Sequence, residues 1–358
     1  MSLAALSSPI SALTRDRRTQ GLLCALVGAV AFSGKAIVAK LMYRHGADAI
    51  SVVGLRMALA LPMFLLMAWW AGRSAGQGGQ VGGTGGAGQK ALSRRQVWQV
   101  IGLGFTGYYL ASTLDFLGLQ YISASLERAI LYLNPSLVLL LSVLLLGQRL
   151  RWAQVLALVI SYAGVLVVFL HDWDLAHLVS DSATSLDARS AVAIGSLLVL
   201  MSALSYAIYL MGSGQLVQEL GSMRLVGQAS CAACVMCLAQ WWVAHAVSDG
   251  RLGGVAHLPW QVWTLSALNA TACTVLPVWL VMRGVQLLGA SVAAQIGMVG
   301  PLSTIWLASW FLDEPVSARL MLGTGTVLVG ILVLTRMGRP GAESPQVKVV
   351  VESEGGRS

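Results

Sequence analysis

Charged residues are scarce in this sequence of 358 residues. Lysine, arginine, aspartate and glutamate together make up 11% of it, whereas hydrophobic residues make up 56%. A water-soluble domain uses charged residues at roughly a quarter of its positions, mainly to cover its surface. A chain with so little charge cannot cover itself with polar side chains. This excludes an ordinary soluble domain and predicts that lipid surrounds most of the protein.

The sequence also lacks a nucleotide-binding motif. Its most glycine-rich stretch, 72–89, is not followed by the Gly-Lys-Ser/Thr step of a phosphate-binding loop. We interpret 72–89 as a flexible linker, and we do not expect ATP to drive an activity of this chain. The net charge of +8 does not indicate nucleic acid, since Lys and Arg form short clusters between apolar runs instead of one basic face.

The five cysteines form no disulfide or metal pattern. All of them lie inside apolar segments, unlike the framework of a secreted domain. Cys231, Cys234 and Cys237 follow a Cys-x-x-Cys-x-x-Cys spacing, but an iron–sulfur cluster needs a fourth ligand and polar surroundings. We interpret the His-Asp-Trp-Asp stretch at 171–174 as part of a solvated loop. The sequence therefore predicts no metal and no cofactor.

Long apolar runs are abundant instead. A helix needs about 20 apolar residues to cross a hydrocarbon core of about 30 Å. Such runs cover 21–43, 50–70, 97–119, 122–145, 152–170, 191–211, 225–247, 260–282, 290–312 and 318–336. They are expected to be helical because lipid offers no partner to unpaired backbone groups. The predicted fold class is an all-α membrane protein with ten transmembrane helices.

The loop cations predict an orientation. With the N-terminus in the cytoplasm, most Lys and Arg residues between the runs fall on the cytoplasmic side, and the opposite side holds Arg44, Arg189, Arg251 and Arg319. This asymmetry follows the positive-inside rule. We therefore expect a multi-pass protein of the inner membrane. We expect its N-terminal segment 1–20 and a disordered tail at 337–358 to lie in the cytoplasm.

The two halves of the chain resemble each other. Gly118-Leu119-Gln120 aligns with Gly284-Val285-Gln286, and the same offset aligns Ala124-Ser125 with Ala290-Ser291 and Pro135 with Pro301. A constant offset without gaps indicates an internal repeat. The halves 21–170 and 191–336 then hold five helices each. Because five is odd, the second half enters the membrane from the opposite side, giving an inverted repeat of the kind that permits alternating access.

Several stretches are similar to one family of membrane carriers. They are Phe32-Ser33-Gly34-Lys35, Leu55-Arg56, 118–125 and Asn134-Pro135, together with Phe311-Leu312-Asp313-Glu314-Pro315. On these residues both halves resemble the EamA-type carriers of the drug/metabolite transporter superfamily. The first half departs from the pattern at Gly147-Gln148-Arg149, where it has no acid. The resemblance implies export or uptake of a solute, often an amino acid or another metabolite.

Ionisable residues inside the predicted spans belong to the first half. Lys35, Lys40, Arg56, Asp115, Glu127 and Arg128 all fall in the outer half of the membrane, and the positions equivalent to Glu127 and Arg128 hold Ala293 and Ala294. A charge at mid-membrane costs at least about 2.5–3.5 kcal/mol. These groups are therefore expected to pair, facing the bundle interior or a water-filled cavity. The excess of cations predicts an anionic or zwitterionic solute, held by Lys35 and Arg56.

Other interpretations of these charges stay open. Lys40 can extend to the outer headgroups. Asp115 and Glu127 can neutralise Arg56 and Arg128 as fixed ion pairs, or one of the two acids can carry a coupling proton. Aromatic and polar residues at similar depth are further candidates for the solute pathway: Tyr108, Tyr132, Asn134, Tyr206, Tyr209, Trp279 and Gln295.

Pro135 and Pro301 lie near the middle of their spans, at equivalent positions of the two halves. A proline within a helix frees a backbone carbonyl and bends the helix, which predicts hinges beside the solute site, with a packing kink as the alternative. Gly164, Gly323, Gly325 and Gly330 permit close helix contacts. The sequence leaves open whether those contacts lie within one subunit or across a homodimer.

Taken together, these patterns predict a secondary transporter and not an enzyme. It moves a small polar, amino-acid-like metabolite across the inner membrane by alternating access, in the direction of export, with a proton as a candidate coupling ion. Its partners are the solute and the lipid bilayer. The alternative is a membrane-embedded enzyme acting on a lipid or isoprenoid, which would need paired acids or histidines at the headgroup level.

Overall fold

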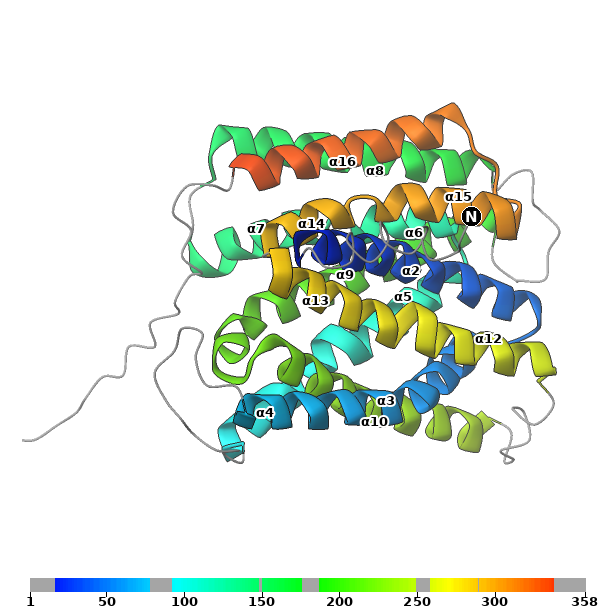
Figure 1. Cartoon of the computed structure of the whole chain (residues 1–358). Coiled ribbons are helices and arrows are strands. Elements are labelled where there is room, and N and C mark those ends of the chain that lie inside the picture. Colours follow the sequence, from blue (N-terminus) through cyan, green and yellow to red (C-terminus); the bar gives the residue numbers. More distant parts are fainter. Residues whose placement is uncertain are drawn as a thin grey trace, which may run out of the picture.

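The computed structural model describes residues 17–77, 92–147, 150–175, 187–248, 258–288 and 290–337, and these residues contain helices and no strands (Figure 1). The helices run roughly parallel to one another. The first half contains α2 (Arg17–Arg44), α3 (Ala49–Gln77), α4 (Arg94–Gly104), η2 (Phe105–Leu110), α5 (Ala111–Leu119), α6 (Ala124–Leu131), α7 (Asn134–Leu146) and α8 (Trp152–Leu175). The second half contains α9 (Ala188–Leu220), α10 (Ser222–Ser248), α12 (Trp260–Ala270), η3 (Thr271–Val275), α13 (Leu276–Leu288), α14 (Ala290–Gly297), α15 (Gly300–Leu312) and α16 (Ala318–Met337).

Each predicted apolar run is helical. Within the described residues, nine helices are long and apolar enough to cross a membrane. The remaining predicted run, 290–312, consists of α14 and α15, which have 8 and 13 residues, and it is not among these nine. The linker predicted at 72–89 begins later than expected, because α3 continues to Gln77. The rest of that linker, most of segment 1–20 and nearly all of the tail at 337–358 lie outside the described residues.

Pro135 and Pro301 begin helices instead of bending them. Pro135 stands in the first turn of α7, after a break at Tyr132 and Leu133, and Pro301 stands in the first turn of α15, after a break at Met298 and Val299. Proline is accepted there because the first backbone N–H groups of a helix have no intrahelical partner. The predicted spans 122–145 and 290–312 are therefore each two short helices with a break near mid-span.

Other local features recur at the same offset in the sequence. η2 and η3 are π-helical segments that begin at Phe105 and Thr271, inside the third span of each half. α7 and α15 both end in a left-handed residue, Gly147 with φ 64° and Asp313 with φ 58°. A left-handed conformation is easy for glycine and uncommon for aspartate. Its presence at Asp313 shows that the two halves share local backbone geometry despite different side chains.

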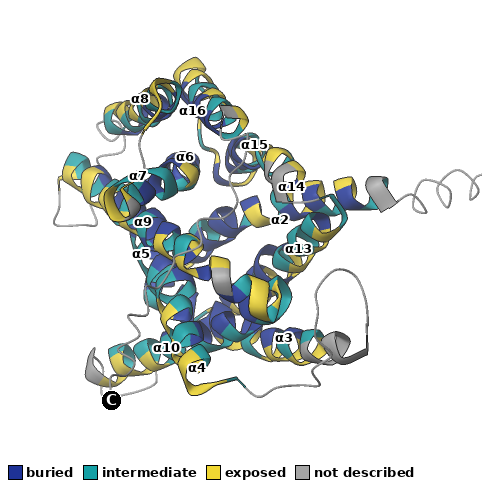
Figure 2. Cartoon of the chain, turned by 90° about the vertical axis from the view of Figure 1, so that its left-hand side faces the viewer, coloured by how far each residue is buried: buried dark blue, intermediate teal, exposed yellow. Residues whose placement is uncertain are grey.

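The spans pack in pairs that also correspond between the halves. α8 packs along α16 and α3 along α10, each pair joining equivalent helices, while α2 packs on α13 and α9 on α5 (Figure 2). The α8–α16 pair forms one edge of the bundle, and the other helices are arranged around the centre of the bundle. The largest group of buried apolar side chains lies between α2, α3, α5, α10 and α12. Helices from both halves therefore build a common core.

We expect a methyl group at Gly330 to weaken the α8–α16 contact. A Cβ atom there would lie 2.2 Å from Ser161 Oγ and 2.7 Å from the Ser161 nitrogen. Overpacking of this kind costs about 1–3 kcal/mol, so Gly330→Ala should lower the unfolding temperature of the purified protein. Gly325→Ala is the control on the same helix, because nothing lies within 4 Å of its Cβ position. Equal unfolding temperatures for the two variants would contradict the expected contact.

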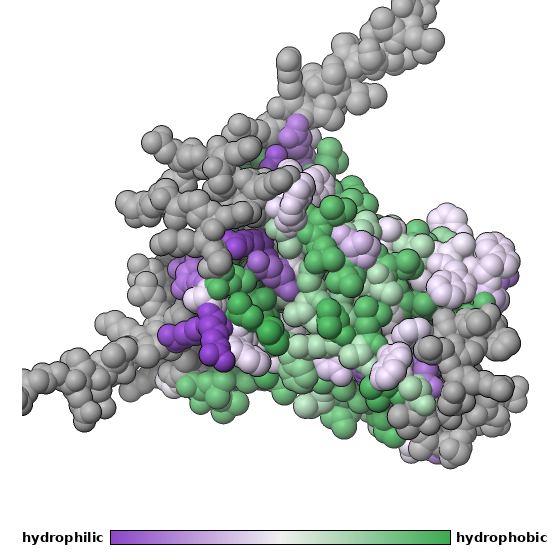
Figure 3. All heavy atoms as spheres, turned by 90° about the horizontal axis from the view of Figure 1, so that it is seen from below, coloured by the Kyte–Doolittle hydropathy of each residue, from purple (hydrophilic) through white to green (hydrophobic). Residues whose placement is uncertain are grey.

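The outside of the bundle is apolar, as expected for a lipid-facing surface. Large hydrophobic side chains are exposed along α7, α8 and α15, with Trp152 at 88% and Trp310 at 83%. Figure 3 shows hydrophobic side chains across the middle of one face, with hydrophilic side chains gathered at one end. Exposed apolar area of this extent is unusual for a soluble monomer. The chain is a multi-pass membrane protein.

The stretch at 171–174 differs from its predicted place in a solvated loop. α8 continues through it, and His171 and Asp172 are buried. Asp172 accepts hydrogen bonds from the backbone nitrogen and the hydroxyl of Ser123, at 2.9 and 3.0 Å. The expectation was wrong because this helix exceeds the apolar run by a turn, which brings Asp172 against the start of α6.

Candidate functional site

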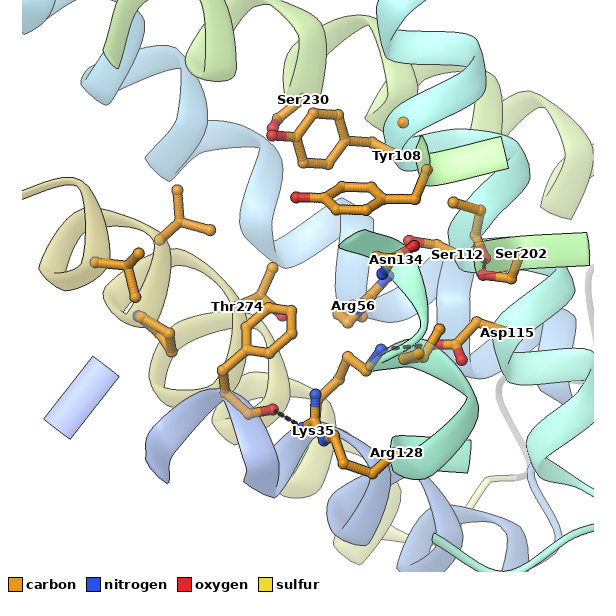
Figure 4. A pocket seen from close by; sticks show the side chains of 18 of the residues that line it. Lys35, Arg56, Tyr108, Ser112, Asp115, Arg128, Asn134, Ser202, Ser230 and Thr274 are labelled. Carbon is orange, nitrogen blue, oxygen red and sulfur yellow. Dashed lines mark hydrogen bonds and ion pairs between the residues drawn. The ribbon is translucent and has the colours of Figure 1, made fainter. Parts of the chain in front are cut away.

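A cavity of about 510 Å³ lies inside the bundle. α2, α3, η2, α5, α6, α7, α9, α10, η3 and α13 line it, so both halves contribute. Its charged side chains gather at one end, and Tyr108 and Ser230 lie at the other (Figure 4). We call the end of the bundle that holds residues 45–48 and 313–317 the outer end, after the orientation predicted from the loop cations. The charged end of the cavity is nearer to that outer end.

Lys35 connects two carboxylates at the charged end. Its Nζ atom lies 2.5 Å from Asp115 Oδ2 and 3.5 Å from Glu127 Oε1. All three side chains are at least nine-tenths buried, and Glu127 is completely buried. Such a cluster persists away from water only when opposite charges compensate one another. Lys35 is therefore held by two acids, each from a different helix, and α2, α5 and α6 are tied together.

Arg128 is bound to the protein on two sides. Its Nε atom donates to Thr304 Oγ1 at 3.1 Å, and Nη2 donates to the Phe32 carbonyl at 2.9 Å. The guanidinium carbon also lies 5.4 Å from the centre of the Phe32 ring. These contacts join α6 to α2 and α15, so Arg128 links the two halves beside the cavity.

Arg56 is the lining cation with unpartnered nitrogens within the described part of the chain. Its side chain is buried, and the guanidinium carbon lies 4.4 Å from the centre of the Phe116 ring. Its Nε and Nη2 atoms have no hydrogen-bond partner among the described residues, and neither has Asp115 Oδ1. A buried donor without a partner carries a desolvation cost of about 1–3 kcal/mol, and more when it is charged. Arg56 thus carries buried donors beside the cavity that no described residue satisfies.

The break between α6 and α7 faces the cavity. Tyr132, Asn134 and Pro135 line the wall there, and the Tyr132 hydroxyl donates to the carbonyl of Gly297 at the end of α14. The Asn134 side-chain oxygen is buried without a partner in the described part of the chain. The two helix breaks, one in each half, are therefore joined by Tyr132 next to the cavity.

The opposite part of the wall is apolar and aromatic. α13 contributes Pro277, Val278, Val281 and Met282, and Phe64 lies on α3. Tyr108 and Tyr206 complete this part. The Tyr108 and Tyr209 hydroxyls lie 3.2 Å apart, with ring centres 5.2 Å apart. The cavity is therefore polar and charged at one end and apolar over much of the remainder.

Polar contacts close the outer end of the bundle. Glu314 accepts from the Ala124 nitrogen at 2.9 Å and from the Ser125 hydroxyl at 3.2 Å, and lies 3.9 Å from Lys40 Nζ. The Arg44 side chain donates to the Leu312 carbonyl, and Tyr43 donates to the Phe116 carbonyl at 2.8 Å. We call Glu314 with Lys40, Ala124 and Ser125 the outer latch. It connects the α15–α16 loop of the second half to α6 and α2 of the first.

Most of the predicted pathway residues line this cavity. They are Lys35, Arg56, Tyr108, Asp115, Arg128, Tyr132, Asn134 and Tyr206, and the predicted hinge residue Pro135 lines it as well. Glu127 contacts Lys35 without being part of the lining. Trp279 and Gln295 are exposed and are not among the lining residues, and Pro301 is buried at the start of α15. Lys40 Nζ lies 3.9 Å from Glu314 Oε1. Among the described residues, Asp115 and Glu127 both form ion pairs with Lys35, where one interpretation expected Arg56 and Arg128.

Several residues of the site were not predicted. Phe32 and Phe116 provide the rings beneath Arg128 and Arg56, and Lys35 Nζ lies 5.4 Å from the Phe116 ring centre. Phe116 directly follows Asp115, and Phe32 lies one turn before Lys35. An aromatic residue this close in sequence to a buried charge could have predicted a contact between a ring and a cation. The contact between Glu314 and α6 had no such signal, since the residues lie far apart in the sequence.

Comparisons with known proteins agree with this architecture. The family model described as "EamA-like transporter family" matches residues 19–170 and 193–336, once in each half. These ranges closely follow the two halves that the internal repeat defines. The match covers more than half of the chain.

Two curated relatives are described as uncharacterized transporters. YcbK of Bacillus subtilis is 29% identical over 307 residues, covering 86% of this chain and 90% of that protein. A protein of Archaeoglobus fulgidus is 24% identical over 251 residues, covering 68% of this chain and 81% of that protein. A crystal structure of a protein that is 17% identical has a TM-score of 0.53 and covers 90% of this chain and 100% of that one. The last likeness concerns the fold alone.

Proposed function

The chain belongs to the EamA-like transporter family, and we propose from this membership that it is a secondary carrier. It moves a small polar metabolite that is amino-acid-like and anionic or zwitterionic across the inner membrane, in the direction of export. The observation that carries this proposal is the internal cavity, which places cationic side chains inside an otherwise apolar bundle. Charge at this depth in a membrane protein is expensive and typically marks a solute or ion pathway.

We further propose that the halves form an inverted repeat of ten transmembrane helices that exchange inward-facing and outward-facing states. Support comes from the equivalent helix breaks, π-helical segments and left-handed caps, and from the equivalent pairs α2–α13 and α9–α5. In such a repeat the contacts that close one end have counterparts at the other end, so the two states are close in free energy. The breaks before Pro135 and Pro301 are the proposed hinges.

The described conformation corresponds in this scheme to a carrier closed at its outer end. The Lys35 cluster lies at the charged end of the cavity, and the outer latch joins the α15–α16 loop to α6 and α2 at the outer end of the bundle. The lining continues along α13 to Val281 and Met282 and along α9 to Tyr206, away from the outer end. With both termini in the cytoplasm, as the loop cations predict, a solute would enter this cavity from the cytoplasm. That order of events supports export, with Asp115 or Glu127 as the candidate carrier of a coupling proton.

Counterflow in liposomes tests the proposal. Purified protein is reconstituted with an unlabelled mixture of the proteinogenic amino acids and common organic acids inside the liposomes. Each solute is then supplied outside in radiolabelled form. We expect transient accumulation of at least one labelled solute, and none in protein-free liposomes. Stabilisation of the detergent-purified protein by a solute that never accumulates would contradict a carrier and favour a membrane-embedded enzyme.

Removing the outer latch should favour opening at the outer end. Glu314→Ala deletes two hydrogen bonds to a charged group, each worth about 1.5–3 kcal/mol. If these contacts exist only in the closed state, the open population should rise at least about tenfold. Spin labels on His45→Cys and Val316→Cys, both exposed at the outer end, report the distance by double electron–electron resonance. We expect an added longer-distance component.

The control for the latch variant is Arg319→Ala. Arg319 also lies at the outer end, but its pair with Asp174 is exposed, with side chains 69% and 59% accessible. An exposed pair contributes little to stability, so the distance distribution should match that of the parent protein. Unchanged distances in Glu314→Ala would show that the latch does not hold the outer end closed.

A further inference from the structure

Among the three cations at the charged end of the cavity, only one has nitrogens without a partner in the described residues. Lys35 is engaged by two carboxylates, and Arg128 by Thr304 and a backbone carbonyl. Arg56, which is 3% exposed, has two nitrogens without a partner in the described residues. Because the other cations already have partners, an anion that enters the cavity would satisfy Arg56 before it competed for the others.

The two unpartnered nitrogens are neighbours on the guanidinium group. Nε and Nη2 point their N–H groups from the same edge of the plane, and two parallel N–H donors on one edge match the two oxygens of a carboxylate. The Phe116 ring, 4.4 Å from the guanidinium carbon, restricts the orientation of that plane. The arrangement therefore favours a planar anion bound through two oxygens.

The local charges favour a single negative charge on the solute. Lys35, Arg56 and Arg128 provide three cations around the charged end, and Asp115 and Glu127 provide two anions. One positive charge is left uncompensated. A monoanion neutralises it, whereas a dianion would leave one negative charge without a partner inside an apolar bundle, which costs several kcal/mol.

The rest of the wall favours a solute with an apolar part. α13 presents Pro277, Val278, Val281 and Met282 to the cavity, with Phe64 and Tyr206 on other helices. A polar group placed against these side chains would lose its hydrogen bonds to water and gain none. Apolar or aromatic atoms would instead bury surface there at about 25 cal/mol per Å². The volume of about 510 Å³ lies within the usual range for small-molecule sites.

We propose that the solute is an amphipathic monocarboxylate whose carboxylate binds the Nε–Nη2 edge of Arg56 and whose apolar or aromatic body lies against α13. The inference rests on the proposed carrier function and specifies its substrate class. Arg56 thereby selects the anionic group, and the α13 wall selects the body of the solute.

Four related probes separate the features of such a solute. 3-Phenylpropanoate carries both the carboxylate and the body, acetate lacks the body, 3-phenylpropanamide lacks the charge, and benzylsuccinate adds a second carboxylate. Thermal shift of the protein in lipid nanodiscs measures binding, because a ligand that binds the folded state raises the unfolding temperature. We expect phenylpropanoate to bind at least about tenfold more tightly than each of the others. Equal or tighter binding of acetate or benzylsuccinate would overturn the proposal.

Two variants test separately whether Arg56 binds the carboxylate and whether the α13 wall binds the apolar body of the solute. Arg56→Gln should weaken phenylpropanoate binding at least about tenfold and leave the amide unchanged. Val281→Thr keeps the side-chain shape, adds a hydroxyl to the wall, and should weaken phenylpropanoate several-fold without affecting acetate. Arg319→Gln, outside the cavity, is the control. Unaltered phenylpropanoate binding in both Arg56→Gln and Val281→Thr would place the ligand elsewhere and overturn the assignment.

Transport measurements keep this inference separate from the carrier function. Counterflow of phenylpropanoate-like monocarboxylates by the wild-type protein would support both. Counterflow restricted to short or dianionic solutes would leave a carrier but overturn the substrate class. Counterflow of no solute in the whole panel would contradict the carrier function itself, and the substrate class with it.

Discussion

Lys35→Met is expected to destabilise the protein by about 3–5 kcal/mol and to abolish transport. Methionine has a similar length, so the main change is the loss of the ammonium group that lies 2.5 Å from Asp115 and 3.5 Å from Glu127. Breaking a buried ion pair on one side leaves charge without compensation, and this accounts for the size of the effect. The loss should appear as a lower unfolding temperature in nanodiscs and as background counterflow in liposomes.

A triple variant separates stability from transport at this cluster. Lys35→Met combined with Asp115→Asn and Glu127→Gln removes all three charges together. Replacement of a whole buried cluster by neutral groups is often neutral or stabilising, so most of the lost stability should return. Transport should not return, because the proposed pathway would have lost both its cation and its candidate proton carriers. A single variant as stable as the wild type would show that the two acids are not compensated by Lys35.

Arg56→Gln is also expected to lower transport, by about 10–100-fold, but to leave the stability of the protein unchanged or to raise it. The guanidinium is buried, and its Nε and Nη2 atoms have no partner among the described residues. Its removal therefore eliminates a desolvation cost without breaking a hydrogen bond of these two atoms. The transport loss corresponds to about 1.5–3 kcal/mol from a charge-assisted contact with the solute. Counterflow rates and unfolding temperatures of the same preparations measure both effects.

Arg56→Lys refines this prediction. Lysine keeps the positive charge but cannot offer two parallel N–H groups from one plane. We expect it to recover part of the transport rate, between those of the glutamine variant and the wild type. Arg319→Gln, which removes an exposed cation, should behave as the wild type in both measurements. A large loss of stability in Arg56→Gln would show that Arg56 is a structural cation and not a solute contact.

The uneven distribution of charge gives the two ends of the proposed carrier different chemistry. Glu127 and Arg128 are charged, whereas their equivalents in the second half are Ala293 and Ala294. The outer closure therefore contains ion pairs and charged hydrogen bonds, including Glu314 with Lys40. The counterpart of Glu314 is Gln148, for which the structure gives no description.

Some features of the site could be anticipated because charge in lipid is so costly. Lys35, Arg56, Asp115 and Arg128 stood out in an apolar sequence and all line the cavity. Their pairing could not be anticipated. In the sequence, several cations are possible partners of Asp115 and Glu127. Only the distances in the folded bundle identify Lys35 as the partner of both. The same holds for Trp279 and Gln295, which share the expected depth but face outward.

The positions of the membrane helices follow from the amino-acid sequence alone, since about 20 consecutive apolar residues leave the backbone no other way to satisfy its hydrogen bonds in lipid. The duplication follows from the sequence as well, through the offset that joins Pro135 to Pro301. The rotation of each helix about its axis and the pairing of the charges depend on how the helices pack. Lipid-facing and core-facing sides are both apolar in such helices, so hydrophobicity cannot tell them apart. Contacts such as Glu314 with Ala124 exist only once the halves have packed together.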